Sequence, residues 1–390
     1  MIYLDNAATT PVSDEVIQAM IPYFNNKWYN PSSLYSKAKD VKRDISIARK
    51  TIADFINAES DEIYFTSGGS ESNCLAIQGW LKYVQSLNLR PCIITTVIEH
   101  KSISECVKDL HKSGIEVLYL PVNEYGYVNP SNLEKALKST LLKFDSVLVS
   151  VQYANNEIGT IQNIKLLADI AHKYIATFHT DAIQAFGKIN IDVSELGVDM
   201  MSVSGHKIHA PKGIGFLYVN ENTKIKPLIY GNQENGLRGG TENVPYIIGF
   251  AEAVKLFSSK KYDWIHMLNV KEYLISRLKE EFDCKINSNE NYNSLNIVNA
   301  TFPQNITGEA LIQLLDISDI MVSSGSACNS YTNVPSPVLK AIGLSDDEIN
   351  RTIRISLSDI ASLYDIDKFT SELKKCINLI TEDSEVNLIE

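Results

Sequence analysis

The sequence lacks any run of about 20 apolar residues, so none of its segments is long enough to form a transmembrane helix. Its first residues, MIYLDNAATTPVS, have neither a basic start nor an apolar core, and we therefore expect no signal peptide. It also lacks a CxxC pair, because its six cysteines are scattered at positions 74, 92, 106, 284, 328 and 376. In a chain of 390 residues this pattern favours free thiols in a reducing compartment over a disulfide framework or a zinc site. We expect a cytoplasmic protein that neither spans a membrane nor carries a metal.

An excess of positive charge is missing as well. The chain has 36 Lys and Arg against 47 Asp and Glu, a formal net charge of -11. This balance argues against direct nucleic-acid binding by the surface as a whole. The basic stretch KAKDVKRDISIARK (37–50) is interpreted as a helix with a solvated face rather than a nucleic-acid patch. With 44% hydrophobic residues, the chain is an ordinary globular one, long enough for two domains.

Between residues 60 and 220, short apolar runs alternate with segments of helical periodicity. EIYFTS, CIITTVI, EVLYLPV, SVLVSVQ, TFHTDA, DMMSVS and GIGFLYV are strand candidates. Alternation at this spacing predicts a mostly parallel sheet covered by helices. After about residue 260 the pattern changes to that of a smaller α+β domain. We predict a large domain over 15–258 and a small domain formed by 1–14 together with 259–390.

Polar residues stand where several of these strands end. FTSGGSES (65–72) is a strand, a Gly-Gly turn and a helix start, which is either a phosphate site or an ordinary turn. Asp181 after TFH is either a helix N-cap or a partner for a protonated ring nitrogen. His100 is either structural or an aromatic ring that stacks on a flat ligand. Lys207 in SGHK is either a solvated loop charge or an amine at the carboxyl edge of the sheet, where open α/β sheets bind ligands.

Taken together, these four features match the needs of pyridoxal phosphate. That cofactor requires an anchored phosphate, an acid beside its pyridine nitrogen and a lysine that binds its aldehyde. The sequence therefore predicts that Lys207 is a cofactor-binding amine.

Several motifs, which occur in the order expected for one enzyme family, extend this prediction over nearly the whole chain. They are YLDNAATTPV (3–12), FTSGGSESNCLAI (65–77), NNEIGTIQ (155–162), HTDAIQAFGK (179–188), SVSGHKIHAPKGIG (202–215), LRGGTENV (237–244) and SSGSAC (323–328). The sequence thus resembles the cysteine desulfurases of the NifS/IscS kind. This resemblance implies a fold-type I transferase that depends on pyridoxal phosphate, with a mostly parallel seven-stranded sheet in its large domain and a smaller α+β domain.

The resemblance also implies individual roles for the cofactor site. Lys207 forms the Schiff base with the cofactor, and Asp181 pairs with the pyridine nitrogen. Gln184 meets the phenolic oxygen of the ring, His100 stacks on the ring as a catalytic residue, and Asn155 contacts cofactor and substrate. The phosphate contacts implied for this subunit are Gly69, Ser70, Ser204 and His206.

Three further residues receive roles in the same way. Thr241 completes the phosphate site from the other subunit of a homodimer. Arg354 grips the carboxylate of the substrate, a task that suits the fork of a guanidinium group. Cys328 accepts the sulfur. A free cysteine is more often an inert buried thiol, but the small polar residues around Cys328 favour an exposed loop.

The function implied is the removal of sulfur from L-cysteine, giving L-alanine and a persulfide on Cys328. The sulfur then passes to an acceptor protein, such as an Fe–S scaffold or a thiolation enzyme. One alternative is a selenocysteine lyase or related lyase on the same scaffold, in which Cys328 is dispensable. Another is a non-catalytic protein that binds and regulates an assembly partner. Such a protein is expected to have lost the lysine or the cysteine, and both are present.

Overall fold

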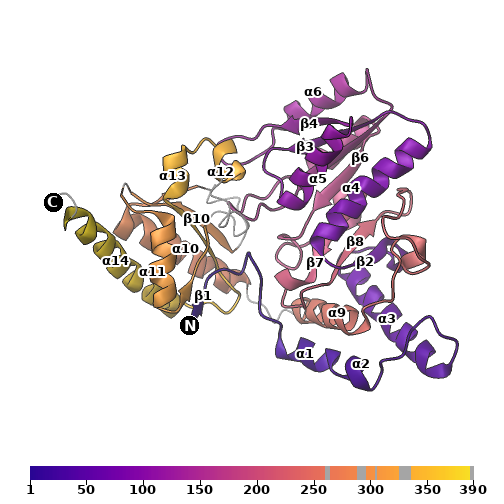
Figure 1. Ribbon diagram of the computed structural model, residues 1–390, viewed down its shortest axis with the longest axis horizontal. Coiled ribbons are helices and arrows are strands. Elements are labelled where there is room, and N and C mark those ends of the chain that lie inside the picture. The colour runs from indigo at the N-terminus through magenta and orange to yellow at the C-terminus, as the bar shows by residue number, and fades with distance from the viewer. Residues whose placement is uncertain (260–263, 288–295, 304, 325–334, 387–390) are drawn as a thin grey trace.

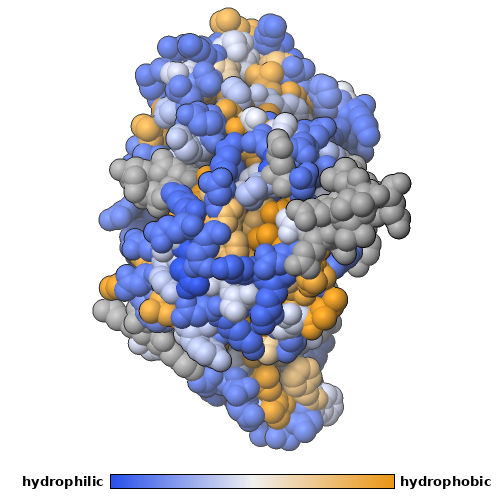
Figure 2. Space-filling view, turned by 90° about the vertical axis from the view of Figure 1, so that its left-hand side faces the viewer, coloured by the Kyte–Doolittle hydropathy of each residue, from blue (hydrophilic) through white to orange (hydrophobic). Residues whose placement is uncertain are grey.

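The computed structural model describes residues 1–259, 264–287, 296–303, 305–324 and 335–386. A larger part built around one sheet lies beside a smaller part, and both chain termini belong to the smaller one (Figure 1). Seen from the end of the smaller part, hydrophilic residues predominate on the surface and apolar residues form small groups (Figure 2).

Within the described residues, the larger part contains a seven-stranded sheet with the order β2-β8-β7-β6-β5-β3-β4. The strands are β2 (Ile63–Thr66), β3 (Pro91–Thr96), β4 (Glu116–Leu120), β5 (Ser146–Gln152), β6 (Thr177–Asp181), β7 (Met200–Ser204) and β8 (Gly215–Val219). Neighbours are parallel except at β8, which runs antiparallel to both β2 and β7. The predicted mostly parallel sheet is confirmed.

Helices cover both faces of this sheet. Successive residues of a strand point to opposite faces, so Met200 and Met201 of β7 belong to two different apolar clusters. The cluster around Met200 includes residues of α4 (Gly69–Ser86) and α5 (Lys101–Lys112). The cluster around Met201 includes residues of α1 (Asp14–Met20), α3 (Ser36–Phe55), α6 (Pro130–Thr140), α7 (Ile164–Lys173) and α9 (Val244–Ser258). Short elements between them are α2 (Pro22–Asn25), α8 (Val193–Leu196) and the 3₁₀ turns η1 (Ser60–Glu62), η2 (Gly205–Lys207) and η3 (Glu234–Gly236).

The smaller part is an α+β unit with its own apolar core. Its antiparallel sheet has the order β12-β10-β9, and a parallel pair joins β1 to β11. The strands are β1 (Ile2–Tyr3), β9 (Lys285–Ile286), β10 (Ile297–Thr301), β11 (Ile320–Met321) and β12 (Thr352–Ser356). The helices are α10 (Trp264–Phe282), α11 (Gly308–Ile317), α12 (Pro337–Ala341), α13 (Asp346–Asn350) and α14 (Leu363–Val386).

The N-terminal strand packs in the core of this smaller part. Ile2 and Leu4 are buried among residues of α10, α11 and α14. The chain then crosses to α1 in the larger part (Figure 1). We call the two parts the large and the small domain; the predicted boundaries at residues 14/15 and 258/259 stay a prediction.

Three observations bear on cysteines, metals and membranes. Among the described residues, the free thiols are those of Cys74, Cys92, Cys106, Cys284 and Cys376. The described part of the chain contains no cluster of His, Cys, Asp or Glu side chains that could hold a metal ion. No helix of that part combines the length and the apolar character needed to cross a bilayer.

Candidate active site

A cavity of about 570 Å³ lies at the carboxyl ends of the parallel strands. Its walls come from the large domain, from the crossing segment around Ala7 and Ala8, and from the small domain through Arg354. The structure brings nine of the sequence-predicted site residues to these walls: Gly69, Ser70, His100, Asp181, Gln184, Ser204, His206, Lys207 and Arg354. Residues far apart in the sequence thus share one enclosed space.

Lys207 lies at the end of the tight turn η2, which follows β7 directly. The turn requires Gly205, because a Cβ there would come within 3.1 Å of Ala210 Cβ. The Nζ atom of Lys207 donates hydrogen bonds to the carbonyl oxygens of Ala7 at 2.5 Å and Ala8 at 2.7 Å. The crossing segment therefore holds the amine of Lys207 at the cavity wall.

Asp181 ends β6 and its side chain is fully buried. Its carboxylate accepts hydrogen bonds from Asn73 Nδ2 at 2.8 Å and from the Ile183 amide at 3.0 Å. Burial raises the pKa of Asp181, while electrostatic interactions with His100 and Lys207 oppose that rise. Within the described chain, no Lys, Arg or His forms an ion pair with this carboxylate. A buried carboxylate in this state is suited to receive a cationic group of a ligand.

His100 is the N-cap of α5, and its Nδ1 accepts the Ser102 amide at 3.1 Å. The Ser102 hydroxyl lies 2.8 Å from the same nitrogen. Burial lowers the pKa of His100 below its usual 6.5, with Asp181 opposing and Lys207 adding to the shift. The ring is therefore held in one orientation, and at neutral pH it is uncharged.

The start of α4 offers backbone amides at one end of the cavity. A Cβ on Gly69 would lie 2.1 Å from Ile183 Cδ1, so any larger residue would require the Ile183 side chain to move. The N-terminus of a long helix attracts anions through its free amides and its dipole. His206 borders the same cavity, and burial lowers its pKa to about 4, so its ring is neutral at pH 7.

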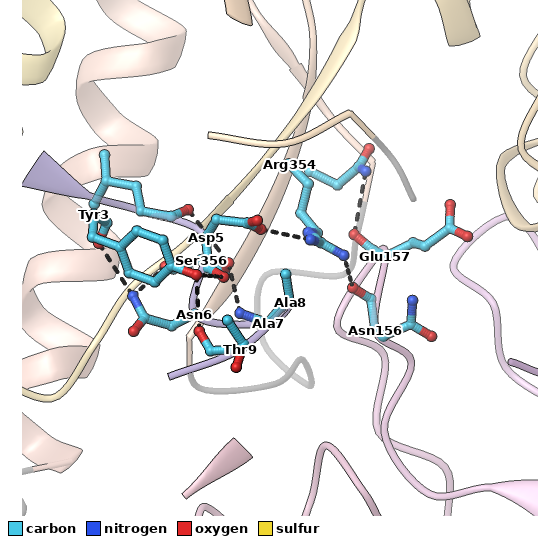
Figure 3. Close-up of polar contacts among 12 residues, drawn as sticks. Tyr3, Asp5, Asn6, Ala7, Ala8, Thr9, Asn156, Glu157, Arg354 and Ser356 are labelled. Carbon is cyan, nitrogen blue, oxygen red and sulfur yellow. Dashed lines mark hydrogen bonds and ion pairs between the residues drawn. The ribbon is translucent and has the colours of Figure 1, made fainter. Parts of the chain in front are cut away.

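Arg354, on β12, is 2% exposed and joins the two domains at the cavity (Figure 3). One terminal nitrogen donates to Asp5 Oδ1 at 2.7 Å and the other to the Asn156 carbonyl oxygen at 3.0 Å. Its Nε atom is buried and, among the described residues, has no hydrogen-bond partner. The guanidinium is thus fixed on two sides and keeps unused donors.

Two predicted site residues, Asn155 and Thr241, do not line this cavity. The Asn155 amide instead holds its own turn, donating to the Ile98 carbonyl at 3.0 Å and accepting the Glu157 amide at 2.8 Å. Thr241 is exposed on a separate surface, beside Gly240 and Arg238. Cys328 lies outside the described residues. Their predicted roles stay predictions.

Other groups at the site were not predicted from the sequence. Asn73 holds the Asp181 carboxylate, and Asn156 lines the wall next to Arg354. Glu99 is another residue of the cavity wall. Its Oε2 atom is buried without a partner among the described residues, and burial raises the pKa of Glu99 to about 8. The position of Asn73, one helical turn after Gly69, was the available signal for its role.

Comparison with known proteins identifies the family. The aminotransferase class-V family pattern matches residues 2–369. The chain belongs to this family. A cysteine desulfurase IscS of Methanosarcina thermophila is 42% identical over 369 residues, which cover 94% of this chain and 89% of the relative.

Solved structures of class-V aminotransferases agree with this assignment. A NifS-like protein has a TM-score of 0.88 and 33% identity, covering 97% of this chain and 99% of that one. A structure described as SspA in complex with cysteine has a TM-score of 0.80 and 36% identity, covering 93% and 100%. The predicted fold-type I scaffold is confirmed.

Class-V aminotransferases of this kind depend on pyridoxal phosphate, and the cavity fits that cofactor. The Lys207 amine, the amides at Gly69 and the Asp181 carboxylate border one space. The Asp181 carboxylate has no ion-pair partner in the described chain, which a protonated pyridine nitrogen would provide. The lack of a side chain at Gly69 leaves room for a phosphate against the helix.

Proposed function

We propose that this chain is a cysteine desulfurase that depends on pyridoxal phosphate. It converts L-cysteine to L-alanine and leaves the sulfur as a persulfide on Cys328. The observation that carries this proposal is one cavity containing the Lys207 amine, the buried Asp181 carboxylate and the Arg354 guanidinium. The relatives named cysteine desulfurase and the related structure with bound cysteine support the choice of substrate.

Bound pyridoxal phosphate supplies an electron sink for the bonds around the substrate's α-carbon. Asp181 keeps a proton on the pyridine nitrogen, because a buried carboxylate fixed by Asn73 favours a cationic neighbour. The neutral ring of His100 would cover one face of the bound cofactor and exclude water from it. The amides at Gly69 and Ser70, with Ser204 and His206, would hold its phosphate.

Lys207 would hold the cofactor through its amine and would move the proton at the substrate's α-carbon. The carbonyls of Ala7 and Ala8 hold its Nζ atom at the cavity wall. A lysine suits this role since its amine is both a nucleophile and a base. Arg354 receives the substrate carboxylate on the donors that Asp5 and Asn156 leave free.

The sulfur transfer is assigned to Cys328 on its sequence motif. Its thiolate attacks the sulfur of the substrate, forming an S–S bond as the carbon–sulfur bond breaks. The electron pair of that bond stays with the carbon skeleton, which takes up a proton and leaves as alanine. Only the thiolate is a competent nucleophile. The persulfide then reaches a sulfur-acceptor protein, an Fe–S scaffold or a thiolation enzyme, in the cytoplasm.

The cofactor assignment is tested by borohydride reduction of the purified yellow protein. Reduction fixes the cofactor to its lysine, and peptide mapping then identifies that lysine. We expect the label on Lys207 alone. A label on Lys188 or on a surface lysine would overturn the assignment.

The desulfurase proposal is tested against the lyase alternative with Cys328→Ser. Serine at neutral pH is a poor nucleophile, so alanine release from cysteine should fall at least a hundredfold while the visible spectrum stays intact. Cys106→Ser, a half-buried thiol on α5, is the matched control and should retain activity. Alanine release by Cys328→Ser near the wild-type rate would favour a lyase that acts without this cysteine.

We also propose a homodimer in which Thr241 completes the phosphate site of the partner. Thr241 is exposed and does not border the cavity of its own chain. Apolar side chains on and after α1 and α2 are exposed, at 41–65% for Ile17, Ile21, Phe24 and Trp28. Light scattering should give twice the chain mass of 43.5 kDa. A fully active monomer at assay concentration would contradict the role of Thr241.

A further inference from the structure

Lys188 is a buried lysine for which the proposed chemistry has no use. It follows β6 by seven residues and is 7% exposed. Its Nζ atom donates to Gln184 Oε1 at 3.1 Å, the one hydrogen bond recorded for it among the described residues. Within that part of the chain no carboxylate forms an ion pair with it. A lysine in this situation is unusual, because burying an unpaired ammonium is costly.

The surroundings of Lys188 are positive rather than negative. Burial lowers the pKa of Lys188 to about 7, and the charges of Lys207 and Arg354 add to the shift. A charged Lys188 in this position therefore lowers the free energy of unfolding. Replacing it by an apolar residue of similar length removes this cost, which makes the role of its hydrogen bond accessible to experiment.

The partner of Lys188 is a side chain of the cavity wall. The Gln184 amide nitrogen donates to the Ala7 carbonyl at 2.8 Å, and its oxygen accepts from Lys188. The reversed amide would place its oxygen against the Ala7 carbonyl and its NH₂ group against the Lys188 side chain; the first contact is unfavourable, and the second is unfavourable whenever Lys188 is an ammonium, which only donates. Lys188 and Ala7 thus select one of the two amide orientations.

This orientation places an N–H group beside the reactive lysine. The Ala7 carbonyl accepts both Gln184 Nε2 and Lys207 Nζ, so the two nitrogens share one acceptor. An amide nitrogen has two hydrogens, and Ala7 takes one of them. Gln184 borders the cavity, so a ligand bound there lies next to this amide group.

We propose that Lys188 is a positioning residue that holds the Gln184 amide with its N–H group toward the phenolic oxygen of pyridoxal phosphate. This inference rests on the proposed cofactor site. With Lys188 in place, the ionised phenolic oxygen meets a donor. Without it only the Ala7 carbonyl fixes the amide, and each time the amide turns its oxygen opposes that negative charge.

The test is a spectroscopic pH titration of the holoenzyme with Lys188→Met. The visible absorption of the lysine-bound cofactor changes with protonation, and a donor to the phenolic oxygen favours the deprotonated form of the link. Loss of a charge-assisted hydrogen bond corresponds to about a tenfold change. The titration midpoint should therefore rise by about one pH unit, and apo protein should bind added pyridoxal phosphate several-fold more weakly.

A double-mutant cycle separates positioning from a general effect of charge. If Lys188 acts through Gln184, Lys188→Met should shift the midpoint by less than about 0.3 units in a Gln184→Ala background. An equal shift in both backgrounds would overturn the proposal, because the charge would then act directly. Lys212→Met removes an exposed positive charge from the segment after Lys207 and should leave the midpoint unchanged.

Two further outcomes keep the test decisive. If Lys188→Met does not fold, Lys188→Gln, which keeps a shorter donor, takes its place and should shift the midpoint in the same direction. If Lys188→Met folds, binds the cofactor and titrates like the wild type, the positioning role is wrong while the proposed function stands. Failure of the wild-type protein itself to bind pyridoxal phosphate would instead overturn the proposed function.

Discussion

Replacing Arg354 by lysine tests how the substrate carboxylate is bound. The guanidinium donates to Asp5 and to the Asn156 carbonyl, and its Nε atom has no partner in the described chain. A lysine keeps the positive charge but offers one nitrogen in place of three. Because that nitrogen is drawn to Asp5, at least one charged hydrogen bond to the substrate is lost.

The expected fall in kcat/KM follows from the number of hydrogen bonds to the substrate carboxylate that are lost. A hydrogen bond to a charged group contributes about 1.5–3 kcal/mol. Since about 1.4 kcal/mol corresponds to a factor of ten, kcat/KM for L-cysteine should fall about ten- to 150-fold in Arg354→Lys. Most of the change should appear in KM, because the carboxylate is bound before and during the reaction alike.

The assay measures initial rates of alanine formation over a range of cysteine concentrations, with excess dithiol to remove the persulfide. Arg351→Lys is the matched control. Arg351 directly precedes β12, the strand that carries Arg354, and it pairs with Asp347, whose side chain is 73% exposed. The control should change KM less than twofold. An unchanged KM in Arg354→Lys with a full complement of cofactor would refute the assignment, and Asn155 would be the next candidate.

Three further predictions concern the cofactor cradle, a buried histidine and a buried ion pair. Gly69→Ala places a methyl group 2.1 Å from Ile183 Cδ1, so the variant should lose pyridoxal phosphate several-fold faster than the wild type on dialysis. If both proteins lost the cofactor at the same rate, the proposed phosphate site at Gly69 would be wrong. Burial lowers the pKa of His179 to about 3, so the unfolded chain alone takes up this proton as the pH falls below 6.5. The unfolding free energy should fall by up to about 1.4 kcal/mol per pH unit between pH 6 and 4, and urea titrations of His179→Gln should lack this component of the slope. Glu234→Gln breaks the fork between Glu234 and Arg49, at 2.7 and 2.8 Å, and should lower the calorimetric melting temperature by several degrees; an unchanged one would show that the pair contributes nothing.

The sequence predicted those parts of the site that depend on local pattern. Asp181, His100 and Lys207 each follow an apolar strand, and parallel strands bring their carboxyl ends to one edge. Contacts between distant segments leave no such local signal. The bond from Asn73 to Asp181 joins residues 108 positions apart, and the only signal for it in the sequence was the place of Asn73 one helical turn after Gly69. The antiparallel direction of β8 could not be predicted either, because the pattern of a short apolar strand does not indicate its direction in the sheet.

The segment from Asp5 to Ala8 contacts both Lys207 and Arg354, the two residues that we propose to act on the substrate. Ala7 accepts hydrogen bonds from Lys207, which belongs to the large domain. Asp5 pairs with Arg354 of the small domain, 349 residues further along the chain (Figure 3).

The same segment is tied to β12 by two further bonds. Asn6 Nδ2 donates to the Ser356 carbonyl at 3.0 Å, and the Ala7 amide donates to Ser356 Oγ at 2.9 Å. Three successive residues therefore fix the Lys207 amine relative to the Arg354 guanidinium, which we propose to receive the substrate carboxylate. An amino acid carries its α-carbon one bond from its carboxylate, so both groups must be held at a set distance for the α-proton to reach Lys207. A geometric error of about 1 Å at such a site can cost a hundredfold in rate. This requirement explains why so short a segment, buried for much of its length, joins the two domains at this point.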